Sequence, residues 1–179
     1  MPMAKSAHRQ PVLKPQDLYL LLVLAACHDQ GTTYPELAAV SGLSMSEVHA
    51  ALKRAGAAGL LHFEAKRPRI IPDALREFLF HGAKYAFPAL RGGVVAGIPT
   101  AHAAEPLSAQ ITASADPPPV WPSISGTVRG IALAPLYPSA PSAALRNRKL
   151  YESLALFDAI RAGNARERTL ARKLLEERL

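Results

Sequence analysis

The sequence predicts a mainly α-helical protein with a two-stranded β hairpin in its first half, followed by an extended Pro-rich segment and a C-terminal helical hairpin. Three observations lead to this fold class. Two motifs that start helices lie eleven residues apart, at Thr33 and Ser44, with Gly42 between them. Prolines gather in residues 92–142, where they interrupt long regular elements. Residues 143–179 again carry apolar side chains at helical spacing.

Composition and charge indicate a folded protein with a polyanionic partner. Of the 179 residues, 49% are hydrophobic, which is enough apolar surface for a packed core. The formal net charge of +7 favours a polyanionic partner, because each phosphate that Lys or Arg neutralises releases condensed counterions.

Cysteine usage and hydropathy indicate the compartment. Cys27 is the single cysteine, which excludes an internal disulfide and a thiolate metal cluster and is typical of a cytoplasmic protein. The longest apolar run, residues 18–27, is shorter than the roughly 20 residues that span a bilayer. We therefore expect a buried core helix there, and no membrane partner.

The first elements are predicted from residues that start and stop helices. We expect residues 1–13 to form a flexible N-terminal tail. Pro15 lies where a first helical turn tolerates proline, and a helix is expected from there to about His28. Thr33 and Glu36 have the spacing of a capping box, in which each side chain hydrogen-bonds the other residue's backbone amide.

A second capping box, Ser44 with Glu47, follows the first. Gly42 between the two boxes supplies a turn with positive φ, which glycine adopts without a Cβ clash. Helices are therefore expected over residues 34–41 and about 44–58.

A β hairpin and a fourth helix complete the first half. Residues 60–63 and 69–71 are expected to form two short strands, with the basic tip at residues 65–68 between them. Pro72 then begins a fourth helix, whose apolar residues fall on one face at 3.6-residue spacing, and Pro88 ends it.

Three small or apolar positions fit a close crossing of the second and third helices. They are Ala38, Gly42 after three intervening residues, and Val48 after five more. A Leu-Lys-Arg run at residues 52–54 and an Ala-Gly-Leu-Leu run then lead into the basic hairpin. In this order the motifs resemble the winged helix-turn-helix family, and we take residues 14–91 as the domain. The resemblance implies a DNA-binding domain of a bacterial-type transcriptional regulator.

In this family the third helix enters the major groove, and the hairpin, called the wing, lies near the flanking backbone or minor groove. The resemblance places nine candidate DNA contacts on these two elements: Ser44, Ser46, His49, Ala50, Lys53 and Arg54 on the helix, and Lys66, Arg67 and Arg69 on the wing. The serines and Lys53 would meet phosphate, and His49 would contact a base edge. Because Ala50 and Ala51 replace polar side chains common in the family, we expect a homodimer that contacts two half-sites of double-stranded DNA.

The sequence predicts neither catalysis nor a cofactor. The six histidines are scattered, without an H-x-x-x-H pair or an acidic partner at metal-ligand spacing. The glycines form no dinucleotide or P-loop motif, and no serine stands in a G-x-S-x-G context. We therefore expect no enzyme activity, no metal and no organic cofactor.

The second half predicts a surface for a partner. Residues 92–142 combine prolines with large apolar side chains such as Trp121, so we expect an extended segment that wraps over its own domain or a second subunit. Residues 127–133 are expected to form a short strand. Residues 143–179 are expected to form a helical hairpin that packs on its own core or on a partner. The alternative function is an interaction module, such as an antitoxin or adaptor, that binds a protein through residues 92–179.

Overall fold

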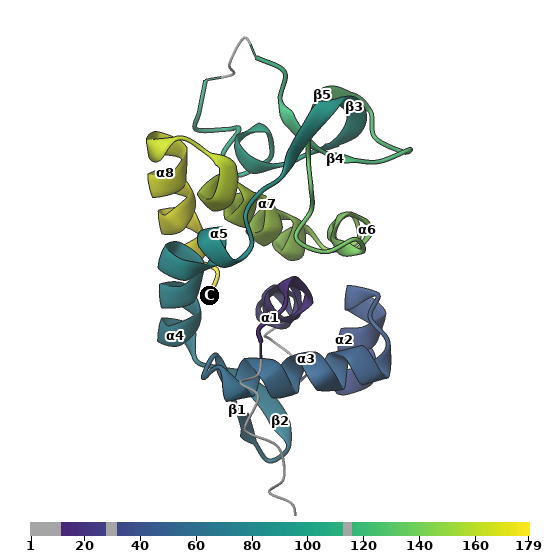
Figure 1. Ribbon diagram of the computed structural model, residues 1–179, viewed down its shortest axis with the longest axis vertical. Helices are drawn as coiled ribbons and strands as arrows, with labels where there is room; N and C mark the ends of the chain where they lie inside the picture. Colours follow the sequence, from purple (N-terminus) through teal and green to yellow (C-terminus); the bar gives the residue numbers. More distant parts are fainter. Residues whose placement is uncertain (1–11, 28–31, 113–115) are drawn as a thin grey trace, which may run out of the picture.

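The computed structural model describes residues 12–27, 32–112 and 116–179 (Figure 1). The N-terminal tail predicted over residues 1–13 therefore lies almost entirely outside the described residues. The chain is mainly α-helical, as predicted, with one two-stranded and one three-stranded sheet. The two sheets lie at opposite ends of the molecule (Figure 1). No helix of the described residues is both long and apolar enough to cross a membrane.

Helix α1 (Pro15–Ala26) lies at the centre of the molecule (Figure 1). Its side chains from Leu18 to Leu24 are all buried, as expected for a helix that is apolar all round. Helix α1 contacts α2 (Tyr34–Ser41), α3 (Met45–Ala57) and, from the second half of the chain, α7 (Arg148–Ala162). The two halves of the chain therefore share one hydrophobic core.

The two predicted capping boxes are confirmed. The Thr33 amide donates to the carboxylate of Glu36 over 2.7 Å at the start of α2. The Ser44 amide donates to the carboxylate of Glu47 over 2.8 Å at the start of α3. Gly42 between them has a φ of +73°, which is the left-handed conformation predicted for this turn.

Strands β1 (Leu61–Glu64) and β2 (Arg67–Ile70) form the predicted antiparallel hairpin. Ala65 and Lys66 at its tip have φ values of 47° and 66°, the geometry of a tight two-residue hairpin turn. The region of the predicted fourth helix is divided into three parts: α4 (Pro72–Glu77), a π-helical turn (Phe78–Gly82) and α5 (Ala83–Ala86).

The Pro-rich region differs from the predicted extended segment, because it contains a three-stranded sheet. Strand β3 (Arg91–Pro99) pairs antiparallel with both β4 (Pro119–Pro122) and β5 (Val128–Leu133), which pair in parallel with each other. Only β5 corresponds to a predicted strand. The prolines of β3 and β4 stand at strand ends, where a missing amide disturbs the ladder least.

Two glycines let the three strands close tightly. A Cβ on Gly97 would lie 2.3 Å from the carbonyl oxygen of Trp121, and one on Gly130 would lie 2.0 Å from that of Pro118. Both distances are far inside van der Waals contact, so only glycine fits these positions. The close approach depends on strands that are distant in the sequence, which is why the local pattern does not reveal it.

Trp121 of β4 reaches a buried polar centre on α7. Its indole Nε1 donates to Asp158 Oδ2 over 2.6 Å, and the Thr100 hydroxyl donates to the same oxygen over 2.8 Å. Arg161 donates to Asp158 Oδ1 and to two backbone carbonyl oxygens. Because the side chains of Arg161 and Asp158 are only 3% and 2% exposed, these hydrogen bonds replace water for both charges. The centre joins the three-stranded sheet to α7.

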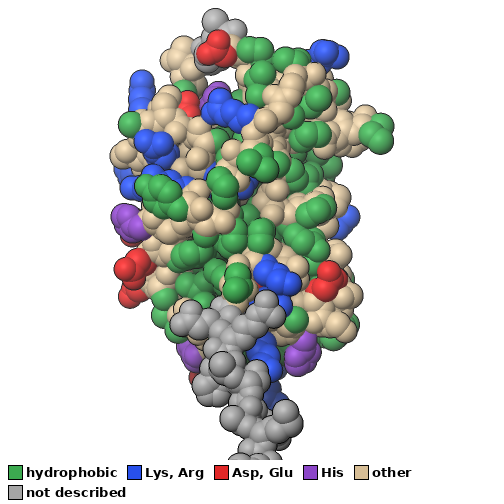
Figure 2. Space-filling model, in the orientation of Figure 1, with side chains coloured by type: hydrophobic (Ala, Val, Ile, Leu, Met, Phe, Trp, Pro, Cys, Tyr) green, Lys and Arg blue, Asp and Glu red, His purple; other side chains and the backbone are tan. Residues whose placement is uncertain are grey.

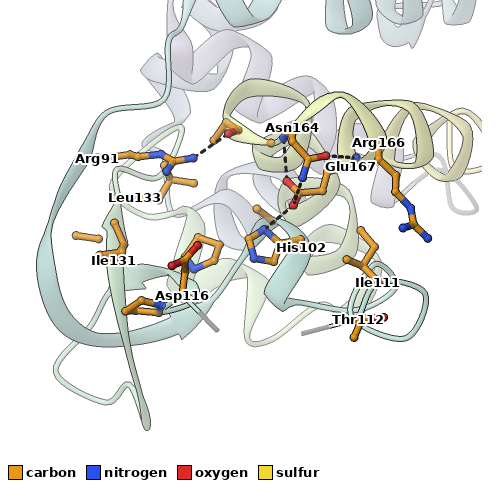
Figure 3. A pocket seen from close by; sticks show the side chains of 16 residues that line it. Arg91, His102, Ile111, Thr112, Asp116, Ile131, Leu133, Asn164, Arg166 and Glu167 are labelled. Carbon is orange, nitrogen blue, oxygen red and sulfur yellow. Dashed lines mark hydrogen bonds and ion pairs between the residues drawn. The ribbon is translucent and has the colours of Figure 1, made fainter. Parts of the chain in front are cut away.

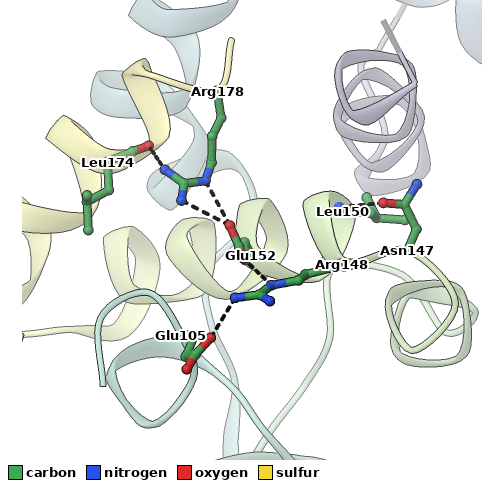
Figure 4. Close-up of polar contacts among 7 residues, drawn as sticks. All are labelled: Glu105, Asn147, Arg148, Leu150, Glu152, Leu174 and Arg178. Atoms are coloured by element: carbon green, nitrogen blue, oxygen red, sulfur yellow. Dashed lines mark hydrogen bonds and ion pairs between the residues drawn. The ribbon is translucent and has the colours of Figure 1, made fainter. Parts of the chain in front are cut away.

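Helices α6 (Ala140–Ala144) and α8 (Ala165–Glu176) complete the chain, and α7 and α8 pack as a helical hairpin. Glu152 of α7 accepts hydrogen bonds of 2.9 Å from Arg148 and from Arg178 (Figure 4). Burial raises the pKa of Glu152, but the hydrogen bonds and charges of the two arginines outweigh it and lower the pKa below its ordinary value. This network fastens the C-terminal turn to α7.

Candidate nucleic-acid interface

One face of α3 is exposed and the other is buried. Val48 and Leu52 lie in the hydrophobic core. The exposed face carries four of the predicted site residues: Ser46, His49, Ala50 and Lys53. Helix α3 lies at the end of the molecule remote from the three-stranded sheet (Figure 1). This face therefore points away from the second half of the chain.

Ser44 is exposed, but its hydroxyl is used within the chain. It donates to Glu47 Oε2 over 2.7 Å and accepts from the Glu47 amide at 3.3 Å. Hydrogen bonds from the Ser44 backbone amide and hydroxyl lower the pKa of Glu47, so this carboxylate is charged at neutral pH. A negative charge thus occupies the N-terminus of α3, where a phosphate was expected. We therefore treat Ser44 as a capping residue.

His49 is held by a ring that the sequence analysis did not consider. Its imidazole stacks on Tyr34 of α2, with the ring centroids 4.8 Å apart and the planes 17° from parallel. The stack fixes the ring's orientation on the exposed face. Tyr34 lies fifteen positions before His49, so only the packing of α2 on α3 reveals the pair.

Arg54 turns away from the exposed face. Its guanidinium donates to both carboxylate oxygens of Asp17 in α1, over 2.8 and 2.6 Å. The Asp17 side chain is fully buried and the Arg54 side chain is 19% exposed. Hydrogen bonding to Asp17 raises the pKa of Arg54 still further above neutrality. Arg54 is a partner in a core ion pair, and an acidic residue just before the apolar run of α1 was the sequence signal for it.

The hairpin carries the other predicted cations. Lys66 and Arg67 are exposed at and beside its tip. Arg69 lies nearer the body of the protein, where its Nε is 3.2 Å from Glu64 Oε2 on the neighbouring strand. The hairpin therefore presents two cations outward and holds the third in an ion pair.

Three of the predicted cations, Lys53, Lys66 and Arg67, form no ion pair with any other described residue. Helix α3 and the hairpin lie at the same end of the molecule (Figure 1). The three charges are therefore available to an anion outside the chain. Among the described residues, no group of His, Cys, Asp and Glu side chains could hold a metal ion.

A cavity of about 560 Å³ lies apart from this face, between the three-stranded sheet and the turn that joins α7 to α8 (Figure 3). Arg91 and Arg166 line it together with Asp116 and Glu167, and His102 Nδ1 is 3.4 Å from Glu167 Oε1. The lining carries two guanidinium groups and two carboxylates, so the charge of the cavity favours no single class of ligand. It contains none of the predicted site residues.

Comparisons with known proteins give no match: no family model, no curated protein and no solved structure matches the chain. The function is therefore inferred from the residues and their arrangement alone.

Proposed function

We propose that the chain is a double-stranded DNA-binding transcriptional regulator of the winged helix-turn-helix type. In this proposal α3 is the recognition helix and the β1–β2 hairpin is the wing. The order of elements supports it, with α1, α2, a glycine turn, α3 and a hairpin in succession. The left-handed Gly42 between two capped helices supports the turn.

The observation that carries the proposal is a set of three cations on α3 and the hairpin that form no ion pair with another described residue. Lys53 projects from the exposed face of the helix, and Lys66 and Arg67 project from the hairpin. A helix with its side chains is about 10–12 Å across, which matches the roughly 12 Å width of the major groove. With α3 in the groove, the hairpin cations would meet the flanking phosphates, which carry most of the affinity but no sequence information.

In this proposal His49 and Ala50 contact the bases. The stacked imidazole of His49 offers a hydrogen bond in a fixed direction, and the methyl group of Ala50 suits a thymine methyl. A good base contact contributes only about 1–3 kcal/mol of discrimination. Two such contacts from one helix are few, so we propose a homodimer that binds two half-sites and thereby controls transcription.

Salt-dependent binding to a duplex tests the proposal. The site variant removes the three unpaired cations: Lys53→Ala, Lys66→Ala and Arg67→Ala. The control variant removes three exposed cations that also have no ion-pair partner among the described residues: Arg129→Ala, Arg166→Ala and Lys173→Ala. Both variants lose the same charge, so a difference between them reports position and not net charge.

The site variant should reduce the slope of log K against log salt by about 2 to 3, since each lost phosphate contact changes it by roughly 0.9. The control variant should keep a slope near that of the wild type. Equal losses in the two variants would contradict the proposed interface, and so would a wild-type chain that does not bind duplex DNA.

A protein-interaction role, as an antitoxin or adaptor, is the second candidate. Exposed large apolar side chains on α5, on β3 and in the link between them favour it: Tyr85 is 75% exposed, Leu90 66% and Val94 50%. Figure 2 shows hydrophobic side chains gathered over the middle of the viewed face. A stoichiometric protein that co-purifies from the native host with the wild type, but not with Tyr85→Ser/Leu90→Ser, would support this role. Purification of the chain alone would count against it.

A further inference from the structure

A loop from the second half of the chain reaches the turn between α2 and α3. It runs from the end of β5 to α6, and its Ser139 hydroxyl donates to the carbonyl oxygen of Ser41 over 2.7 Å. The Tyr19 hydroxyl of α1 donates to the same oxygen over 2.8 Å. Ser41 is fully buried, so the two hydroxyls fix a backbone group that water does not reach.

The contact at the turn is also sterically close. A Cβ on Gly42 would lie 3.2 Å from Ser139 Cβ, at a residue whose φ is already +73°. The turn therefore has little room to shift toward the second half of the chain.

Tyr137 extends the contact to the first turn of α3. Its ring stacks on Tyr19, with centroids 5.5 Å apart and planes 15° from parallel. Its hydroxyl donates to Glu47 Oε1 at 3.4 Å, while Glu47 Oε2 accepts from Ser44 in the capping box. One carboxylate thus joins the cap of α3 to the second half of the chain.

The base of the loop is anchored in the C-terminal half. The carbonyl oxygen of Ala134 accepts from Arg161 over 3.1 Å, and Leu136 is buried in the core. The exposed side chains of α3 point away from this loop, so Tyr137 and Ser139 do not compete with a ligand on that face. Tyr137 contacts Glu47 in the first turn of α3, and Ser139 contacts Ser41 and Gly42 in the turn that precedes α3.

We propose that Tyr137 and Ser139 are positioning residues that fix the start of α3 and so set the affinity of the DNA interface. We call the pair the loop clamp. The inference rests on the proposed DNA-binding function, because it assigns the clamp a role in that same site. Contacts made by a helix in a groove depend on placement within about 0.5 Å, so a small release at its start is sufficient to weaken them.

The test compares two double variants of the full chain. The clamp variant, Tyr137→Phe/Ser139→Ala, removes two hydroxyls and keeps the Tyr19 stack. The control variant is Tyr151→Phe/Ser125→Ala, which removes the same two groups elsewhere. Tyr151 donates to the carbonyl oxygen of Pro99 over 2.6 Å, and Ser125 pairs with another serine hydroxyl over 3.0 Å.

Two measurements are made on each protein. Amide hydrogen exchange without DNA is followed at Gly42, Leu43 and Val48, whose amides hydrogen-bond within the turn and the first turn of α3. Affinity for a duplex selected by the wild type is measured across a salt series. The clamp variant loses a long hydrogen bond to the charged Glu47 carboxylate and a neutral hydrogen bond to the Ser41 carbonyl oxygen. This loss predicts about tenfold faster exchange at these amides and about tenfold weaker binding. The salt slope should not change, because no phosphate contact is removed.

The inference is overturned if the clamp and control variants have equal amide exchange rates or equal affinities for the duplex. Faster exchange with unchanged affinity also overturns it, since the clamp would then stabilise the turn without affecting the interface. A wild-type chain that selects no duplex overturns the proposed function instead, and the exchange rates still show whether the clamp holds α3.

Discussion

Arg54 and Lys53 are adjacent in α3, but their replacement by alanine should affect different properties: Arg54→Ala the stability of the fold, and Lys53→Ala the binding of DNA. Among the described residues, Arg54→Ala leaves the fully buried Asp17 carboxylate with one remaining hydrogen-bond partner, the Lys14 amide at 2.9 Å. Loss of one partner of a buried ion pair costs about 3–5 kcal/mol. The Arg54 side chain is 19% exposed, so water can enter after truncation, and we expect the lower end, about 3 kcal/mol. For a chain of this length that lowers Tm by roughly 10 °C.

Lys53→Ala is the matched control, because Lys53 is exposed and has no ion-pair partner among the described residues. It should change the free energy of unfolding by less than about 0.5 kcal/mol, and reduce the salt slope of DNA binding by about 1. The free energy of unfolding of Arg54→Lys should lie between those of the wild type and Arg54→Ala, since an ammonium cannot make the bidentate contact. Urea denaturation at neutral pH, followed by circular dichroism, measures the free energy of unfolding of the three variants. A free energy of unfolding of Arg54→Ala within about 1 kcal/mol of the wild-type value would show that the pair with Asp17 does not stabilise the core.

Three further changes test other parts of the structure. Gly42→Ala should destabilise the chain by about 1–2 kcal/mol, because alanine is strained at a φ of +73°; urea denaturation measures it, and an unchanged midpoint would contradict the assigned turn. The pKa of Glu152 is lowered in the folded chain, so its stabilising contribution is present above its ordinary value of 4.5 and is lost as the pH falls through the folded value. Glu152→Gln should therefore be less stable at pH 7 and lose less stability between pH 5 and pH 3, and parallel stability curves would argue against the arginine network. Trp121→Phe removes a hydrogen bond to the buried carboxylate of Asp158 and should cost about 1–3 kcal/mol in thermal unfolding, whereas a neutral result would place the indole outside that centre.

The first half of the fold could be predicted because its signals are local. Each capping box involves residues only three positions apart, and the turn at Gly42 needs only the absence of a Cβ. The hairpin follows from two short apolar runs with a basic tip. These signals act between residues that are close in the sequence, and the tertiary packing of the first half is compatible with them.

The three-stranded sheet could not be predicted, because its determinants are distant in the sequence. Gly97 must meet the backbone at Trp121, and Gly130 must meet it at Pro118. Prolines also argued against strands, and they are tolerated because they stand at strand ends.

The candidate site was predicted in part. Lys53, Lys66 and Arg67 are exposed as the sequence pattern indicated. Arg54 differs because the pairing of α1 with α3 places Asp17 beside it, and helical periodicity alone does not show which of two adjacent cations turns inward. Ser44 differs from the predicted phosphate contact because its capping role uses the hydroxyl that a phosphate would need.

Selection from a pool of random duplex DNA tests the central claim most directly. The wild-type chain and the variant His49→Ala/Lys53→Ala would be taken through the same rounds at fixed salt, and the enriched duplexes sequenced. We expect the wild type to enrich a palindromic motif with two half-sites, and the variant to lose that motif while its fold stays intact by circular dichroism. Enrichment of no motif by the wild type, or of the same motif by both proteins, would contradict α3 as the helix that contacts DNA.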